Sequence, residues 1–303
     1  MPTIKDVAAE AGVTSTTVSR VLNNRGYISE ETREKVYSAM EKLNYMPNEM
    51  ARNLSRQKSD YIGVILPSVE HPYFSKVLHW LEHYVTKHNY KIMVCISENS
   101  REKELQYIDL LYSHRVLGIV VCSHIGETME HLDSNCPLIS FEREIAENIP
   151  AVLCDNYQGG TLAANRLIDA GCRNIAILTN RPRKTSLHTV EKRHLSNVAR
   201  TKKISGRVVY TDRLAPLSEE FSDNILKLLK KNSDLDGIFA TSDVMAANII
   251  RACKKMGKRV PEDISIVGFD DTWISTLTYP SITTIHQPVQ EMCEYAIEAI
   301  VKK

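Results

Sequence analysis

The chain lacks the features of a membrane protein and of a disulfide-stabilised secreted protein. No apolar stretch is long enough to span a bilayer, and no apolar leader segment stands at the N-terminus. The seven cysteines are an odd, scattered set without a CxxC pair, and most lie inside apolar runs such as IMVCIS and IVVCSH. We therefore expect reduced thiols in the core, no metal site and a cytoplasmic protein.

Motifs of the common enzyme classes are also missing. The sequence contains no GxGxxG, no Walker A loop, no GxSxG and no HExxH. Asp243 and Asp270 could imitate the carboxylate pair of a glycoside hydrolase, so a sugar-metabolising enzyme stays open as an alternative. We predict that the chain is not an enzyme and needs no cofactor.

The charge balance gives little indication of a nucleic-acid partner. The formal net charge is +1 over 303 residues, and residues 1–59 hold nine Lys/Arg against seven Asp/Glu. Any specific DNA binding must then depend on placed contacts more than on a strongly basic surface. A chain of this length has room for one or two α/β domains besides a small N-terminal unit.

The most informative segment is IKDVAAEAGVTSTTVSRVLN at residues 4–23. Apolar residues recur at helical spacing on both sides of Gly12, which predicts two short amphipathic helices joined by a turn. The polar face of the second helix carries Ser15, Thr16, Ser19 and Arg20. Hydroxyls suit phosphate oxygens, and an arginine can present a bidentate fork to guanine in the major groove. The pattern indicates a helix-turn-helix that reads DNA, although an ordinary helical hairpin has the same periodicity.

A third helix and a linker follow. Ser29 opens a helical pattern that ends at Asn44. The segment after Pro47 has about seven residues, too few for a stable isolated helix. Met50 and Leu54 share one face of it, so two copies could pack together and present Leu54 to the minor groove, where an apolar wedge kinks DNA. The alternative is that Leu54 packs on the next domain.

Two strings of this region, VAAEAGVTSTTVSRVLN and NYMPNEMARNLSR, resemble the DNA-binding headpiece and the hinge of the LacI/GalR family of bacterial repressors. The resemblance implies that the residue matching Leu54 inserts at the centre of an operator. Together with the helix-face argument, it gives these predicted DNA-binding residues: Thr3, Thr14, Ser15, Thr16, Ser19, Arg20, Asn23, Asn48, Ala51 and Leu54.

From Tyr61 on, short apolar runs alternate with helical patterns, beginning with YIGVIL, KIMVCI and LGIVVCS. Continuous apolar runs are typical of buried parallel strands joined by right-handed crossovers, and the rhythm predicts two doubly wound α/β halves. This part resembles the sugar-sensing core of the same family, which is similar to periplasmic sugar-binding proteins. The strings that carry the resemblance are DNYQGGTLAANRLIDAG, IFATSDVMAA, VPEDISIVGFDDT and ITTIHQP. Within the family, SENSREKELQYIDLL and ISFERE look closest to sucrose-operon repressors of Gram-positive bacteria.

The predicted organisation therefore has three parts. A helix-turn-helix headpiece spans 1–46, a hinge helix and linker span 47–59, and an effector-binding and dimerisation core spans 60–303. The core is expected to be a two-lobed, periplasmic-binding-protein-like structure of parallel sheets, with lobe 1 at about 60–157 and 288–303 and lobe 2 at about 158–287. Family members usually continue beyond the final EMCEYAIEAIVKK, so either the sequence is truncated or the first sheet lacks an edge strand. No leucine heptad follows, which favours a dimer over a tetramer.

An effector site is predicted at the carboxyl ends of the strands, where open parallel sheets bind ligands. Its candidate residues are His71, Tyr73, Phe74, Glu142, Asp243, Asp270 and Gln287. The family resemblance points to the last four of these and adds Arg193. The alternatives are that Asp270 caps a turn and that Tyr73 and Phe74 belong to a helix core. At Glu142, aspartate is commoner in the family.

The clearest departure from the family is the segment at 181–204, which holds eight Lys/Arg. Family members usually carry a Gly-aromatic pair after the position of Arg193, where this chain has His194 and Leu195. The favoured interpretation of the segment is a solvated loop and helix face. The alternative is a cleft adapted to an anion such as a phosphorylated sugar, because cations would stabilise its phosphate.

These features predict a homodimeric transcriptional repressor of a carbohydrate-utilisation operon. A sugar or sugar phosphate, with sucrose and fructose as the first candidates, would release it from a palindromic operator through coupling between two sites. The alternative is a corepressor-activated global carbon catabolite regulator of the same family, with a phosphocarrier protein as a further partner. The expected partners are thus double-stranded DNA, a sugar and a second copy of the chain, and no membrane.

Overall fold

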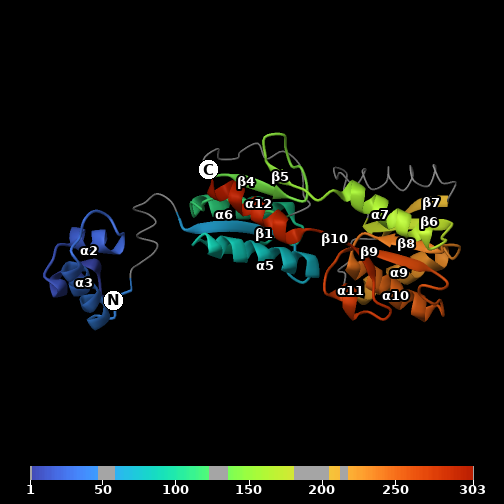
Figure 1. Cartoon of the computed structure of the whole chain (residues 1–303), viewed down its shortest axis with the longest axis horizontal. Coiled ribbons are helices and arrows are strands. Elements are labelled where there is room, and N and C mark those ends of the chain that lie inside the picture. The colour runs from blue at the N-terminus through green and yellow to red at the C-terminus, as the bar shows by residue number, and fades with distance from the viewer. Residues whose placement is uncertain (1, 47–58, 123–135, 181–204, 212–217, 303) are drawn as a thin grey trace. The chain divides into compact units, whose positions relative to one another are not determined.

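The computed structural model describes residues 2–46, 59–122, 136–180, 205–211 and 218–302 (Figure 1). The chain forms two compact units, Met1–Ser59 and Asp60–Lys303. In the described parts of both units, every helix is too short or too polar to cross a membrane.

The first unit contains α1 (Ile4–Ala11), α2 (Ser15–Leu22) and α3 (Glu30–Lys42). The hydroxyls of Thr14 and Ser29 cap α2 and α3 by accepting backbone N–H groups of their first turns. Gly12 ends α1 with a φ of 65°, a left-handed conformation that glycine adopts without strain. The predicted order of helix, glycine turn, helix and third helix is confirmed.

One apolar core holds these three helices together. Val7 from α1, Val18 from α2 and Val36 from α3 are each fully buried in it. The spacing of Val18 and Val21 on α2 turns one face of that helix inward. Its opposite face is left for solvent or a partner.

The second unit begins with a five-stranded parallel sheet whose order is β2-β1-β3-β4-β5. Its strands are β1 (Tyr61–Leu66), β2 (Lys91–Ile96), β3 (Ile119–Val121), β4 (Leu138–Phe141) and β5 (Ala151–Val152). The helices α5 (Pro72–Lys87), α6 (Arg101–Ser113) and α12 (Val289–Val301) pack on it. We refer to this sheet with its three helices as lobe 1.

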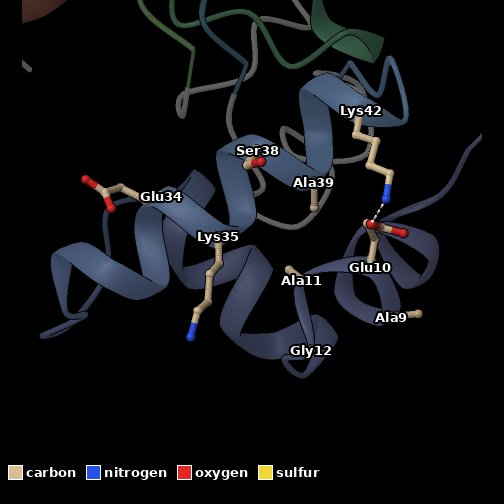
Figure 2. Close-up of a pocket in the computed structure, with 9 residues that line it drawn as sticks. All are labelled: Ala9, Glu10, Ala11, Gly12, Glu34, Lys35, Ser38, Ala39 and Lys42. Atoms are coloured by element: carbon tan, nitrogen blue, oxygen red, sulfur yellow. Dashed lines mark hydrogen bonds and ion pairs between the residues drawn. The ribbon is translucent and has the colours of Figure 1, made fainter.

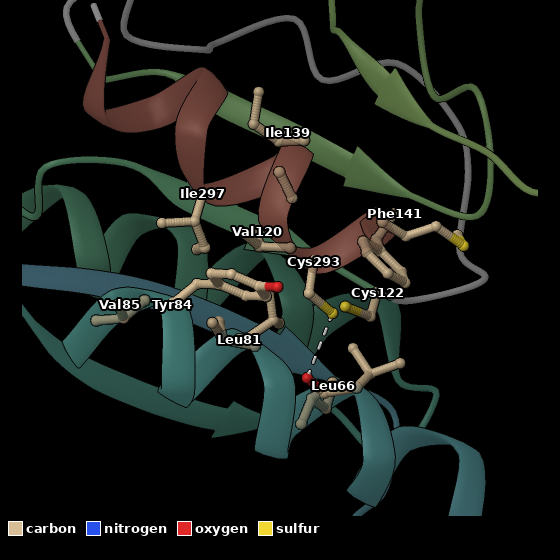
Figure 3. Packing of buried hydrophobic residues seen from close by; sticks show 14 of the residues in the cluster. Leu66, Leu81, Tyr84, Val85, Val120, Cys122, Ile139, Phe141, Cys293 and Ile297 are labelled. Carbon is tan, nitrogen blue, oxygen red and sulfur yellow. Dashed lines mark hydrogen bonds between the residues drawn. The ribbon is translucent and has the colours of Figure 1, made fainter. Parts of the chain in front are cut away.

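Both faces of the central strand β1 are buried, as the continuous apolar run YIGVIL predicts. Val64 and Leu66 of β1 point into a core shared with α5 and α12, whereas Ile65 between them joins the core under α6. Figure 3 shows the first core, with Leu81 and Tyr84 of α5 facing Ile297 of α12. The C-terminal helix α12 therefore belongs to lobe 1.

Lobe 2 is built on a second parallel sheet of order β10-β9-β8-β6-β7. Its strands are β6 (Asn174–Asn180), β7 (Ser205–Thr211), β8 (Gly237–Ala240), β9 (Ser265–Asp270) and β10 (Thr283–His286). Its helices are α7 (Asn156–Asp169), α9 (Glu219–Lys231), α10 (Asp243–Lys255) and α11 (Ile274–Leu277). The helix α7 packs on one face of the sheet, and α9 and α10 pack on the other.

The chain passes from lobe 1 to lobe 2 between β5 and α7 and returns between β10 and α12. The two doubly wound halves predicted from the apolar rhythm are confirmed. The helix α5 begins at Pro72, because proline is favoured in a first helical turn. The strand β5 has two residues, and α11 is a short helix of four residues.

Candidate functional site

The predicted DNA-reading face of α2 is available in the structure. Thr16 and Arg20 are exposed, and Ser15 and Ser19 are half-buried. None of these four side chains belongs to the apolar core of the headpiece. The face can therefore present hydroxyls and a guanidinium to a ligand without unfolding the helix.

Other predicted DNA-binding residues take part in the ends of the helices. The Thr3 hydroxyl donates to Asp6 Oδ2 at 2.8 Å, and Thr14 Oγ1 accepts the Thr17 N–H at 3.1 Å. Asn23 donates from Nδ2 to the Ser19 carbonyl at 2.8 Å. These three side chains fix both ends of the helix-turn-helix, and their contact with DNA stays a prediction. Asn48, Ala51 and Leu54 lie outside the described residues.

A shallow hollow lies between the end of α1 and α3 (Figure 2). An ion pair between Lys42 Nζ and Glu10 Oε1, 2.5 Å apart, crosses it. The predicted DNA-binding residues do not line this hollow. Exposed ion pairs of this kind contribute little to stability.

In the second unit, four predicted effector residues gather where strands end. Asp270 is the last residue of β9, Gln287 follows β10, Glu142 follows β4, and Tyr73 lies in the first turn of α5. We call these four residues the strand-end cluster. Glu142 acts electrostatically on both Tyr73 and Asp270, so the cluster combines residues of both lobes.

Asp270 is the most buried acid of the strand-end cluster, with 5% of its surface exposed. Gln287 Nε2 donates to Asp270 Oδ1 at 2.9 Å. Burial, and then the charge of Glu142, raise the pKa of Asp270 well above its ordinary value. Gln287 is 3% exposed, and its Oε1 has no hydrogen-bond partner within the described structure. An unpartnered buried amide oxygen beside a carboxyl is suited to a ligand that donates hydrogen bonds.

Tyr73 is also buried, and the charge of Glu142 influences its hydroxyl. Its side chain is 3% exposed, and burial together with Glu142 raises the pKa of its hydroxyl well above the usual value. Phe74 packs edge-on against Tyr73, with ring centroids 5.3 Å apart. His71 caps α5 through Nδ1, which accepts the Tyr73 N–H at 3.3 Å, and burial lowers the pKa of His71 to about 4. The aromatic residues belong to the core of lobe 1, and their role in binding stays a prediction.

Asp243 is engaged inside lobe 2. Its side chain is fully buried, and Oδ2 accepts the Thr272 N–H at 2.6 Å and the Thr272 hydroxyl at 2.9 Å. The Thr284 hydroxyl donates to Oδ1 at 2.5 Å. Burial raises the pKa of Asp243 despite these donors. The carboxylate thus connects α10 to the segment after β9 and to β10, and its predicted contact with an effector remains a prediction. Arg193 lies outside the part of the chain that the structure describes.

Three acidic residues at these strand ends have a left-handed backbone. The φ angles are 66° at Glu142, 103° at Asp270 and 49° at Asp271. Residues other than glycine adopt positive φ seldom, and such conformations concentrate at functional sites because surrounding contacts must hold them. The unusual backbone conformations therefore occur at the same strand ends where the strand-end cluster lies.

The sequence argument missed two residues of this region, Lys76 and Asp271. Lys76 Nζ donates to the Asp271 carbonyl oxygen at 3.0 Å, across the two lobes. The Asp271 carboxylate lies 2.8 Å from Nδ1 of His286. Lys76 has no motif around it that indicates such a contact, because its partner lies 195 residues away in the chain.

Comparison with known protein families gives two matches. Residues 3–48 match the model of bacterial regulatory proteins of the lacI family, and residues 164–303 match that of a periplasmic binding protein-like domain. The first match covers α1 to α3, and the second covers most of lobe 2 and α12.

Curated relatives are similar over essentially the whole chain. The sucrose operon repressor of Streptococcus mutans is 34% identical, with 99% of this chain and 92% of the relative covered. The ribose operon repressor of Bacillus subtilis is also 34% identical, with 100% of this chain and 93% of the relative covered. The expected likeness to sucrose-operon repressors is thus present, and ribose-operon repressors share it at equal identity.

Solved structures agree with the fold. The Lac repressor dimer bound to operator and the anti-inducer ONPF matches with a TM-score of 0.86 and 25% identity, over 99% of this chain and 92% of that one. A periplasmic binding protein/LacI transcriptional regulator from Alkaliphilus metalliredigens, complexed with D-xylulofuranose, matches with a TM-score of 0.71 and 30% identity, over 80% of this chain and 90% of that one.

Proposed function

This chain belongs to the LacI family of bacterial regulatory proteins, and on that premise we propose that it is a dimeric repressor of a carbohydrate operon that a sugar releases from its operator. The observation that carries the proposal is that two groups of polar side chains in one chain are not used to hold the fold together. The outer face of α2 leaves Thr16 and Arg20 exposed, and in the strand-end cluster Gln287 Oε1, beside a buried acid, has no hydrogen-bond partner among the described residues.

The first surface is suited to DNA. The headpiece would place α2 in the major groove, where Arg20 contacts a base edge and the hydroxyls contact phosphates. The hinge residues Asn48, Ala51 and Leu54 would follow in the minor groove, with Leu54 as an apolar wedge. A repressor that binds an operator in this way acts in the bacterial cytoplasm.

The second surface is suited to a sugar. Sugar hydroxyls are donors and acceptors in close pairs, and Asp270 with Gln287 offers acceptor oxygens and an amide group, with Tyr73 close enough to be influenced by Asp270. The relatives include sucrose and ribose operon repressors, which makes sucrose, fructose and ribose the first effectors to try.

An exposed apolar segment of lobe 2 supports dimerisation. Trp273 is 62% exposed, Leu277 73% and Tyr279 98%. Apolar side chains gathered on one surface are typical of protein interfaces. A second copy is the occupant that we propose, because a palindromic operator requires two headpieces. Leu277→Asp should then lower the dimer fraction in sedimentation velocity, whereas an unchanged fraction would place the interface elsewhere.

The test of the proposed function uses the full-length protein and a labelled pseudo-palindromic operator from upstream of its own gene. Fluorescence anisotropy would follow binding while sucrose, D-fructose, D-ribose and their phosphorylated forms are titrated. Release by a neutral sugar supports the proposal. Binding that no sugar weakens, or that a phosphorylated sugar strengthens, contradicts it and favours a corepressor-activated regulator.

A further inference from the structure

Lys76 connects the two lobes beside the strand-end cluster. It lies on α5 of lobe 1, and its Nζ donates to the carbonyl oxygen of Asp271 in lobe 2 at 3.0 Å. Asp271 directly follows Asp270, and the charge of Lys76 acts on the Asp270 carboxyl. The half-buried side chain of Lys76 therefore contacts the opposite lobe, and its charge also acts on Asp270, a predicted effector residue.

The acceptor of this hydrogen bond is held firmly. Asp271 has a φ of 49°, and its carboxylate lies 2.8 Å from His286 Nδ1 on β10. Asp270 before it has a φ of 103° and is held by Gln287. Because several contacts fix this backbone turn, the Asp271 carbonyl presents a defined position to an ammonium from the other lobe.

Acidic and basic side chains of the described residues act on Asp270 in opposite directions. Glu142 and Asp243 are carboxylates that raise its pKa, and Lys76 is a cation that lowers it. His71 does not supply a charge at neutral pH, since burial lowers its pKa to about 4. Lys76 thus offsets repulsion between acids that would otherwise oppose ionisation of Asp270.

We propose that Lys76 is a positioning residue of the effector site. It ties α5 of lobe 1 to the end of β9 in lobe 2, and its positive charge favours the carboxylate form of Asp270 as an acceptor for a ligand hydroxyl. The inference rests on the proposed function, because it assigns Lys76 a part in the response to a sugar. Lys76 acts through Asp270 and Asp271 and not by touching the ligand.

The charge effect has a definite sign. Burial and Glu142 raise the pKa of Asp270, whereas Lys76 lowers it. Without Lys76 the pKa rises further, so Asp270 reaches its carboxylate form only at a higher pH. A charged acceptor makes a stronger hydrogen bond than a neutral one, so a sugar should bind the protein without Lys76 more weakly, and this loss of affinity should shrink as pH rises.

Other titratable groups of the described residues also act on Asp270 or are acted on by it. They are Tyr73 and Lys76 from α5, Glu142 after β4, Cys154 after β5 and Asp243 from α10.

A variant series tests the charge. Lys76→Met removes it, Lys76→Arg keeps it, and Lys87→Met is the matched control at the far end of α5, where the lysine side chain is 60% exposed. Sucrose, D-fructose and D-ribose would be titrated against the operator complex at about pH 6 and about pH 8. For the sugar that releases the wild-type protein, the half-release concentration should rise roughly fivefold or more in Lys76→Met at the lower pH. It should rise less at the higher pH and stay near the wild-type value in Lys76→Arg and Lys87→Met.

Hydrogen–deuterium exchange of the free protein tests the tie without any sugar. Lys76→Met should speed exchange both around Lys76 in α5 and in the segment after β9, because each loses its contact with the other lobe. Lys87→Met should leave both segments as in the wild type. If Lys76→Met exchanges like the wild type, or if sugar release and its pH dependence are unchanged, Lys76 does not have this role. If no sugar releases the wild-type protein, the proposed function fails, and the exchange result still decides whether the tie exists.

Discussion

Asp270 and Gln287 meet at the ends of neighbouring strands, where Gln287 Nε2 donates to Asp270 Oδ1 at 2.9 Å. Both side chains are almost fully buried, yet Gln287 Oε1 has no hydrogen-bond partner among the described residues. A buried amide oxygen that accepts no hydrogen bond lowers the stability of the folded protein. We proposed the pair as part of the effector site because a ligand could supply the missing donor.

Asp270→Asn should change how the stability of the protein depends on pH. In the folded protein the pKa of Asp270 is raised, so its protonated form is favoured and the wild-type protein loses stability as pH rises through that value. Asparagine keeps an acceptor for Gln287 and carries no charge. The variant should therefore gain melting temperature relative to the wild type, increasingly so toward alkaline pH. Thermal unfolding across a pH series measures this, with Asp169→Asn as the control at an exposed acid. A difference that stays constant with pH would contradict the assigned burial.

Asp243→Asn should destabilise lobe 2 even without an effector. The carboxylate accepts two hydrogen bonds from Thr272 through one oxygen and one from Thr284 through the other, and asparagine keeps only one of these oxygens, so at least one donor loses its acceptor. Leaving a buried donor unpaired costs about 1–3 kcal/mol. Chemical denaturation of the free protein would measure the loss. Unchanged stability with weakened sugar release would instead identify Asp243 as a ligand contact alone.

Gly268→Ala should destabilise the part of lobe 2 around Asp243 through a steric clash. A Cβ at Gly268 would lie 2.6 Å from Asp243 Oδ1 and 2.9 Å from the Ile282 side chain. Overpacking of this kind costs roughly 1–3 kcal/mol. The matched control is Gly160→Ala in α7, where a Cβ meets open space and alanine favours the helix. Denaturation midpoints should fall for the first variant and hold or rise for the second. Equal midpoints would show that the strand end repacks freely.

Arg20→Ala should relax operator specificity. If Arg20 forms a bidentate contact with a guanine, its loss costs roughly 1–3 kcal/mol on the operator and little on unrelated DNA. Lys35→Ala on α3 is a suitable control, because its lysine is exposed and pairs with Glu31. Competition binding with operators substituted base by base would measure the change. An unaltered base preference in Arg20→Ala would assign the contact to another residue.

Much of the fold could be predicted from local patterns. The run YIGVIL became β1 because an unbroken apolar run is stable only where both faces of a strand are covered. Ser29 and Gly12 marked a helix start and a helix end for reasons of hydrogen bonding and backbone freedom. The strand β5 stops after two residues although apolar residues continue beyond it, because its neighbour β4 pairs with only those two.

The candidate site was only partly predictable. Chain order alone places Asp270, Gln287 and Glu142 at strand ends, so the sequence could nominate them. The sequence could not show that both carboxylate oxygens of Asp243 accept hydrogen bonds inside lobe 2, since the donors Thr272 and Thr284 come from other elements. Nor could it find Lys76, whose partner Asp271 is distant in the chain and accepts through a backbone carbonyl.

The most direct test of the account joins both surfaces in one measurement. Operator anisotropy would be recorded for the wild-type protein and for the double variant Asp270→Ala/Gln287→Ala while sucrose, D-fructose and D-ribose are titrated. We expect a sugar to release the wild-type protein, and we expect the double variant to bind the operator as well as the wild type but to respond to no sugar. A variant that the same sugar releases at the same concentration would contradict the assignment of the strand-end cluster as the effector site.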